Sequence, residues 1–211
     1  MAAVGGYRIE RLDAGSDGLV LAQLAQMQTA ILPESLVSRL GKSFARRFYK
    51  YCSRSKHEAV IVVRQGNRVL GAAVLSLDPG TLDWRLLTRT PMALFAALHF
   101  YHLPLPALVR ETMAKSGARP EDGKLPELVL LFVGTDCRGQ GLGAKLVAAC
   151  DAFLDARAFP AYTVSTAEEE GNCALSFYLA QDFSVSGRAL RHGLFYIVLQ
   201  KKLASAVATD R

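Results

Sequence analysis

The feature that most constrains this chain's fold is an apolar segment that leads through a glycine-rich loop directly into a helix. Residues 127–133 (ELVLLFV) form a nearly continuous apolar run, which is typical of a strand buried on both faces. Residues 138–143 follow as RGQGLG, and the next apolar residues predict a helix over about residues 141–158. Glycines at such a junction let the backbone approach a ligand closely and adopt torsions that a Cβ atom would forbid.

This junction favours a phosphate-binding site. The N–H groups of the first helical turn converge where the helix dipole adds positive charge, which suits a pyrophosphate, and Arg138 can add a charge-assisted contact. A nucleoside-triphosphate loop is excluded because Gly143 is followed by Ala-Lys-Leu, and a dinucleotide fingerprint needs a different glycine spacing. A glycine-rich helix start without any ligand is the alternative. Cys137, which has no histidine near it in sequence, is expected to fill space rather than act as a nucleophile.

The other periodicities predict a single domain over residues 1–203. Alternating or β-branched runs indicate strands at residues 7–11, 59–65, 68–77, 161–165, 183–189 and 194–203. Apolar or amphipathic runs indicate helices at residues 17–32, 36–51 and 172–181. Residues 81–124 are expected to form a helical insertion between the third and fourth strands, and residues 204–211 a frayed tail.

Composition limits the partners. The 211 residues include 25 Lys and Arg against 19 Asp and Glu, a formal net charge of +6, which favours anionic ligands such as phosphorylated cofactors. Because the basic residues are scattered along the chain, we expect no nucleic-acid partner. The four cysteines form no C-x-x-C pair, so we expect neither a metal site nor a disulfide framework, and reduced thiols favour a cytoplasmic protein.

Two segments together resemble a known family. Arg138-Gly139-Gln140-Gly141-Leu142-Gly143 resembles the Q/R-x-x-G-x-G/A acyl-CoA-binding signature of the GNAT N-acetyltransferase superfamily. Residues 172–183 (NCALSFYLAQDF) are similar to that superfamily's N-x-x-A-x-x-F-Y-x-x-x-G-F segment, with Asp182 in place of the glycine. The resemblance implies an α/β (α+β) GNAT acyl-CoA N-acyltransferase fold, in which helices flank a central, mixed, mostly antiparallel twisted sheet.

The resemblance also implies how acetyl-CoA binds. The strand before the glycine loop parts from its neighbour, and the pantetheine arm adds to the exposed strand edge through main-chain hydrogen bonds. The loop holds the pyrophosphate, and Asn172 helps to place the pantetheine arm. The expected cofactor-binding residues are Leu131, Val133, Arg138, Gly139, Gln140, Gly141, Leu142, Gly143, Ala144 and Asn172.

The implied reaction is direct attack of a neutral primary amine on the thioester carbonyl. Tyr178 is the expected general acid for the departing thiolate. Glu127 resembles the catalytic glutamate of histone-acetylating members, and strand alternation predicts that it shares a face with Leu131 and Val133. Because Glu127 lies roughly 13 Å along the strand from Leu131, a bridging water would be needed. The alternative for Glu127 is a solvated charge at the strand entrance.

The acceptor is less constrained. Aromatic residues of the insertion can stack on a sugar ring, and His99 or His102 can deprotonate an amine, although an apolar helical pair packed on the core is the alternative. We expect a small-molecule acceptor such as an amino sugar. A protein or peptide amine, and a non-catalytic acyl-CoA-binding module at a membrane surface, are the alternatives. Residues 91–109 lack formal charge, but their histidines and prolines argue against a spanning helix, and a homodimer is left open.

Overall fold

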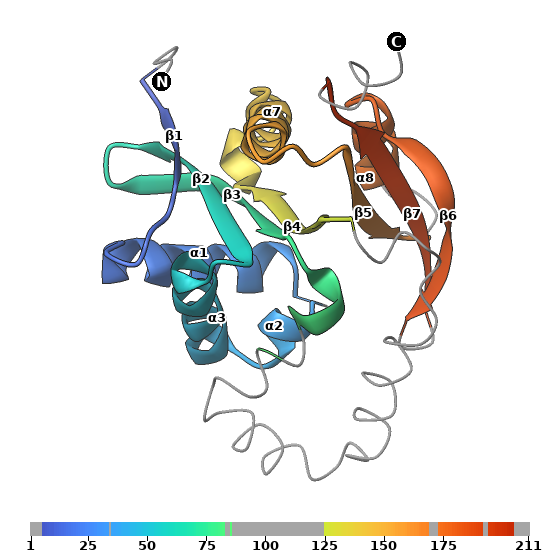
Figure 1. The fold of residues 1–211 in the computed structure, drawn as a ribbon. Coiled ribbons are helices and arrows are strands. Elements are labelled where there is room, and N and C mark those ends of the chain that lie inside the picture. The colour runs from blue at the N-terminus through green and yellow to red at the C-terminus, as the bar shows by residue number, and fades with distance from the viewer. Residues whose placement is uncertain are drawn as a thin grey trace, which may run out of the picture.

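The protein is represented by a computed structural model that describes residues 6–33, 35–82, 85, 125–168, 173–191 and 194–204. One sheet with strand order β1-β2-β3-β4-β5-β7-β6 runs through the molecule (Figure 1). The strands are β1 (Arg8–Arg11), β2 (Glu58–Gln65), β3 (Arg68–Ser76), β4 (Glu127–Val133), β5 (Ala161–Ala167), β6 (Ser184–Arg191) and β7 (Leu194–Lys202). The helices are α1 (Gly18–Ile31), α2 (Leu36–Arg39), α3 (Lys42–Arg54), α7 (Leu142–Asp155) and α8 (Cys173–Leu179). Every pair of neighbouring strands is antiparallel except β4 and β5, which are parallel, so the expected mixed, mostly antiparallel sheet is confirmed.

Two predicted helices have different ends in the structure. The helix expected over residues 36–51 is split into α2 and α3 at Gly41, whose φ of 89° is left-handed and interrupts helical geometry. The helix expected to reach Ala158 ends at Asp155, because the chain turns there and Ala158 has a φ of 57°. The helices expected within the insertion, and the end of the tail, lie outside the described residues.

Helices cover both faces of the β1–β4 half of the sheet. Alternation along β2 directs Val60 and Val62 to one face, where they pack with α1 and α3, and Ile61 to the other face, where it packs with α7. Figure 1 shows α1 and α3 on one side of these strands and α7 on the opposite side. Burial of each such side chain contributes about 1.5–3 kcal/mol, so the two apolar layers fix the helices against the sheet.

The sheet opens between β4 and β5. These strands pair only at Glu127↔Thr163 and Leu128↔Val164. Beyond that point β4 continues along β3, while β5 continues along β7, and Figure 1 shows the half formed by β5, β7 and β6 turning away from β4. The expected separation of the strand before the glycine loop from its neighbour is therefore present.

A β-bulge in β4 changes which of its residues share a face. The register with β3 skips Val129, which is the extra residue of the bulge. Leu128, Leu131 and Val133 pack on the α7 face, so Glu127 lies on the opposite face, with α1 and α3. The prediction that Glu127 shares a face with Leu131 and Val133 is wrong, because simple alternation does not hold across a bulge.

Candidate active site

The loop between β4 and α7 has the backbone conformation that its glycines predict. Gly139 and Gly141 have φ values of 74° and 71°, in the left-handed region where a Cβ atom costs about 1–2 kcal/mol. No neighbouring atom lies within 4 Å of a Cβ placed on either glycine. Both positions therefore need glycine for its torsions rather than for its small size.

Gly143 meets a different requirement. A Cβ placed on it would lie 3.2 Å from the Phe177 ring of α8 and 4.0 Å from the Val133 side chain. The absence of a side chain thus lets α8 pack closely on the first turn of α7. Phe177 was not among the expected site residues, although it belongs to the second family-like segment.

The start of α7 presents main-chain donors without acceptors. The first backbone hydrogen bond here runs from Lys145 N to Gly141 O, at 3.1 Å, and no side chain caps the helix. The N–H groups of Leu142, Gly143 and Ala144 have no acceptor within the described residues. The first turn also lacks acidic residues. Unpaired N–H groups at the positive end of a helix dipole favour an anion.

The charges around the loop strengthen this preference. Arg138 and Lys145 are exposed, and Lys145 donates to the Tyr7 hydroxyl, with its ammonium 4.6 Å from the centre of the Tyr7 ring. Asp136 is the nearby acid, and its carboxylate is paired with Arg68. The hydrogen bond from Arg68 lowers the pKa of Asp136. The local charge that is left unpaired is therefore positive.

The open edge of β4 offers backbone groups to a ligand. Gly134 N donates to Leu70 O at 2.8 Å, which places a hydrogen-bonded pair at that register position. Because such pairs alternate along an antiparallel ladder, the main-chain groups of Leu131 and Val133 point away from β3 and toward the opening. These are the two residues that the sequence assigned to the exposed strand edge.

Cys137 lies behind the loop as a packing residue. Its side chain belongs to the apolar layer beneath α7 and is only 7% exposed. Burial raises the pKa of its thiol, which disfavours a nucleophilic thiolate. The structure therefore favours the expected space-filling role.

Tyr178 faces inward from α8 and is 7% exposed. Its ring makes edge contacts with Phe177 and Phe183, with centroids 5.2 and 5.4 Å apart. Burial, and to a lesser degree the neighbouring Cys150 of α7, raises the pKa of the Tyr178 hydroxyl well above its usual range. The phenol therefore stays neutral at physiological pH and can act as a hydrogen-bond donor.

Glu127 stands where β4 and β5 begin to separate. It is 8% exposed, and Ser165 Oγ of β5 donates to its Oε1 at 3.3 Å. This burial contradicts the alternative of a solvated charge at the strand entrance. Glu127 lies on the α1 and α3 face of β4, whereas Tyr178 of α8 packs in the apolar layer on the α7 face, so the two side chains lie on opposite sides of the sheet.

A buried polar row extends from Glu127 across the sheet. Glu127 pairs in register with Ser76, and Ser76 pairs with Glu58. Glu58 forms an ion pair with Arg85, which also pairs with Asp78 at 2.8 Å. Glu58 and Ser76 are not among the site residues expected from the sequence, although a glutamate at the start of the otherwise apolar strand β2 was a signal for the first of them.

The structure gives no position for several of the expected site residues. Asn172, His99 and His102 lie outside the described residues. Within the ranges that the structure describes, no three His, Cys, Asp or Glu side chains are grouped as a metal site requires. In the same ranges, no helix has both the length and the hydropathy needed to cross a bilayer.

Known proteins show the same architecture. Residues 24–183 match the family model described as "Acetyltransferase (GNAT) family". No curated protein sequence matches the chain. The fold is similar to the ribosomal-protein-S18-alanine N-acetyltransferase from Escherichia coli, at 10% identity and a TM-score of 0.58, with 93% of this chain and 94% of that chain covered.

Two further solved structures extend the comparison. An aminoglycoside acetyltransferase, meta-AAC0020, from an uncultured soil metagenomic sample is 17% identical, with a TM-score of 0.55 and coverage of 88% of this chain and 93% of that chain. The NatC complex bound to Gag peptide and CoA contains a chain that is 15% identical, with a TM-score of 0.54 and coverage of 94% and 99%. At these identities the likeness shows the fold alone.

Proposed function

The chain belongs to the GNAT acetyltransferase family, and from that premise we propose that it transfers the acetyl group of acetyl-CoA to a small-molecule primary amine. The observation that carries the proposal is the opening between β4 and β5 beside an uncapped, glycine-rich helix start. The opening offers a strand edge to the pantetheine arm, and the helix start offers donors to the pyrophosphate.

The chain's own groups suit each part of acetyl-CoA. The N–H groups of Leu142, Gly143 and Ala144 would bind the pyrophosphate oxygens, with Arg138 and Lys145 adding positive charge. The main-chain groups of Leu131 and Val133 would pair with the amides of the pantetheine arm, as an added strand does. Asn172 remains a proposed contact to that arm.

Catalysis would draw on groups from both faces of β4. Glu127 would accept the proton of the attacking amine through a water, as a C–N bond forms at the thioester carbonyl. As the C–S bond breaks, the neutral Tyr178 hydroxyl would donate a hydrogen bond to the leaving thiolate. Because the pKa of Tyr178 is raised, this donation stabilises the sulfur without requiring complete proton transfer.

The amine would approach from the α1 and α3 side of the sheet. Glu127 lies on that face, and its carboxylate favours a cationic acceptor before that amine loses its proton. We therefore propose a small cationic amine such as an amino sugar as the acceptor. A protein or peptide amine is the second candidate, because similar folds include proteins described as acting on each kind of acceptor.

The test is release of free thiol from acetyl-CoA across a panel of amino sugars, polyamines and short peptides. The proposal predicts turnover with at least one amino sugar and tight binding of CoA as product. Turnover with peptides alone would show that the acceptor is a peptide amine rather than a small molecule. Tight binding of acetyl-CoA without turnover on any amine would instead indicate a non-catalytic acyl-CoA-binding module.

A further inference from the structure

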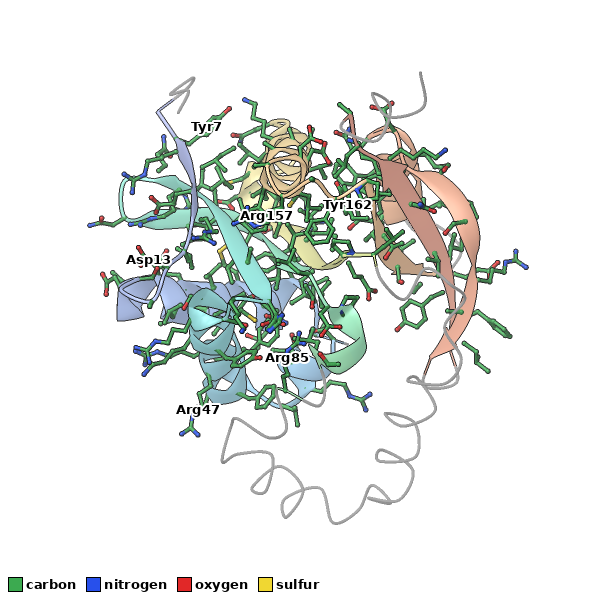
Figure 2. All side chains as sticks on the ribbon, in the orientation of Figure 1. Tyr7, Asp13, Arg47, Arg85, Arg157 and Tyr162 are labelled. Carbon is green, nitrogen blue, oxygen red and sulfur yellow. The ribbon has the colours of Figure 1, made fainter. Side chains whose placement is uncertain are left out.

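A basic groove lies on the α1 and α3 side of the molecule. It has a volume of about 460 Å³ and runs between α3 and the segment that leads into α1. Among the described residues that line it are four cations from α3 and no acidic residue; the cations are Arg46, Arg47, Lys50 and Arg54. Ser43 and Ser53 add hydroxyl groups along the same helix. Figure 2 shows Arg47 projecting from α3 away from the sheet.

The positive charge of this groove is not neutralised by the described part of the chain. The sequence of α3, KSFARRFYKYCSR, contains no acidic residue, and no described carboxylate forms an ion pair with the four cations. Arg46, Lys50 and Arg54 follow one another at four-residue spacing, where like charges repel and destabilise a helix. Other exposed cations do have partners, such as Arg188 with Glu168.

The shape of the groove suits an extended, repeatedly charged chain. Ser43 and Arg54 are eleven positions apart, about 16 Å at helical rise, and cations spaced by four positions are about 6 Å apart. Of the lining residues within the described ranges, Ala14 and Leu21 alone have apolar side chains. Small-molecule pockets are mostly apolar, and protein interfaces have an apolar, aromatic-rich core, whereas nucleic-acid interfaces are polar and strongly positive.

We propose that this groove binds the phosphodiester backbone of a nucleic acid without reading its sequence. Arginine, lysine and serine are the side chains that commonly contact phosphate oxygens, and none of the described residues that line the groove is an aromatic residue that could stack on bases. The expectation of no nucleic-acid partner rested on the scatter of basic residues along the chain. Four of them, however, lie within residues 46–54 of one helix, and α3 presents them together in one groove.

The proposal is independent of acetyl-CoA binding. The groove lies with α1 and α3, whereas the proposed acetyl-CoA loop opens into α7 on the other face of the sheet (Figure 1). Binding of a nucleic acid would therefore leave acetyl-CoA binding unchanged. Failure of either proposal can be recognised without reference to the other.

The test uses the full chain and a short fluorescent uridine oligomer, with binding followed by anisotropy. For a single strand, each phosphate contact contributes about −0.7 to the slope of the logarithm of the binding constant against the logarithm of the salt concentration. About four contacts therefore predict an affinity about 50-fold weaker at 200 mM than at 50 mM salt. The triple variant Arg46→Gln, Lys50→Gln and Arg54→Gln should bind at least about tenfold more weakly at 50 mM salt, with a slope near −0.7. Calorimetry with CoA should give the wild-type affinity for this variant.

A matched control removes the same charge elsewhere. Arg11→Gln, Arg157→Gln and Lys202→Gln change three exposed cations outside the groove that form no ion pair with a described carboxylate, and this variant should keep the wild-type affinity and salt slope. Equal losses in both triple variants would overturn the proposal, as would absence of binding at low salt. Tighter binding to a poly-glutamate peptide, or to phosphatidylserine vesicles, would assign the groove to a different partner and also overturn it.

Folding of the variants is checked by thermal melting. The groove triple variant should melt at or above the wild-type temperature, because it removes like-charge repulsion along α3. Should it unfold, the charge-conserving pair Arg46→Lys and Arg54→Lys provides the second measurement. That pair should retain the salt slope, since phosphate binding depends chiefly on charge, and a lost slope would contradict the proposal.

Discussion

Two glycines of the protein illustrate how one residue type can be required for different functions. Gly141 and Gly66 both adopt left-handed torsions, with φ values of 71° and 55°, and both have open space around a would-be Cβ. Gly141 caps α7 beside the proposed pyrophosphate site, whereas Gly66 turns the β2–β3 hairpin. Any side chain at either position strains the backbone, but only at Gly141 does that strain move the N–H groups of the loop.

We therefore predict that Gly141→Val weakens acetyl-CoA binding by at least about tenfold, since strain of about 1–2 kcal/mol would be relieved by moving the loop. The matched variant Gly66→Val should lose a similar amount of stability and keep its affinity. Calorimetry and thermal melting measure the two effects separately. Equal affinities for both variants would show that the loop does not bind the ligand.

Tyr178 provides a second prediction at this scale. Replacing it by Phe removes the hydroxyl proposed to stabilise the leaving thiolate, so kcat should fall by about 10²-fold or more while KM changes little. The control is Tyr162→Phe, which removes a hydroxyl from the same apolar layer and breaks a 2.7 Å hydrogen bond to Asp151. That variant should lose stability but keep kcat. A Tyr178→Phe enzyme with wild-type kcat would show that the Tyr178 hydroxyl does not assist departure of the thiolate.

The element that decides the catalytic geometry is β4. Its bulge at Val129 turns Glu127 toward α1 and α3, while its edge beyond Leu128 faces the opening. A strand that were regular throughout would instead place Glu127 on the α7 face. The position of the proposed base thus depends on one extra residue in a strand.

The variant Glu127→Gln tests this arrangement. It should lower kcat by about 10²-fold near neutral pH, because the amine would lose its proton acceptor. The deficit should shrink as pH rises through the pKa of the acceptor amine, since more of the acceptor is then already neutral. Initial rates measured across that pH range provide the readout. A deficit independent of pH would indicate a structural role, and Glu168→Gln, at the far end of β5, is the control.

These elements also show how far the sequence alone could go. The glycine loop and its flanking strand and helix could be found from local patterns, because each depends on neighbours in the chain, whereas Tyr178 was singled out only through the family resemblance. The bulge could not, since residues 127–133 are apolar toward both faces and their pattern does not reveal an extra residue. The row of Glu58, Ser76 and Glu127 depends on the register of three strands, which no local periodicity determines.

The molecule as a whole buries several groups that lose protons only at high pH. Burial raises the pKa values of Tyr49, Cys52, Cys150, Tyr162 and Tyr178. Above the pKa values of the unfolded chain, about 8.5 for Cys and 10 for Tyr, the unfolded state binds fewer protons than the folded state. Stability from these groups is therefore fully present below about pH 8.5 and declines as pH rises toward their folded-state pKa values.

We predict a nearly constant melting temperature between about pH 7 and pH 8, a decline above about pH 9 and a steeper decline above about pH 10. Cys150→Ala removes one such group and should reduce the slope of unfolding free energy by about 1.4 kcal/mol per pH unit in the alkaline range. Urea titrations at several pH values measure that slope. A slope unchanged by the substitution would mean that folding does not raise the pKa of the Cys150 thiol.

Amide hydrogen exchange of the full chain, with and without acetyl-CoA, shows whether the glycine loop and the open edge of β4 bind the ligand. We expect acetyl-CoA to slow exchange at Leu142, Gly143 and Ala144 of α7 and at Leu131 and Val133 of β4. These N–H groups face the proposed ligand and lack acceptors in the described structure. Unchanged exchange at all five amides, at a concentration of acetyl-CoA that saturates the protein, would show that acetyl-CoA does not bind at this loop and strand edge.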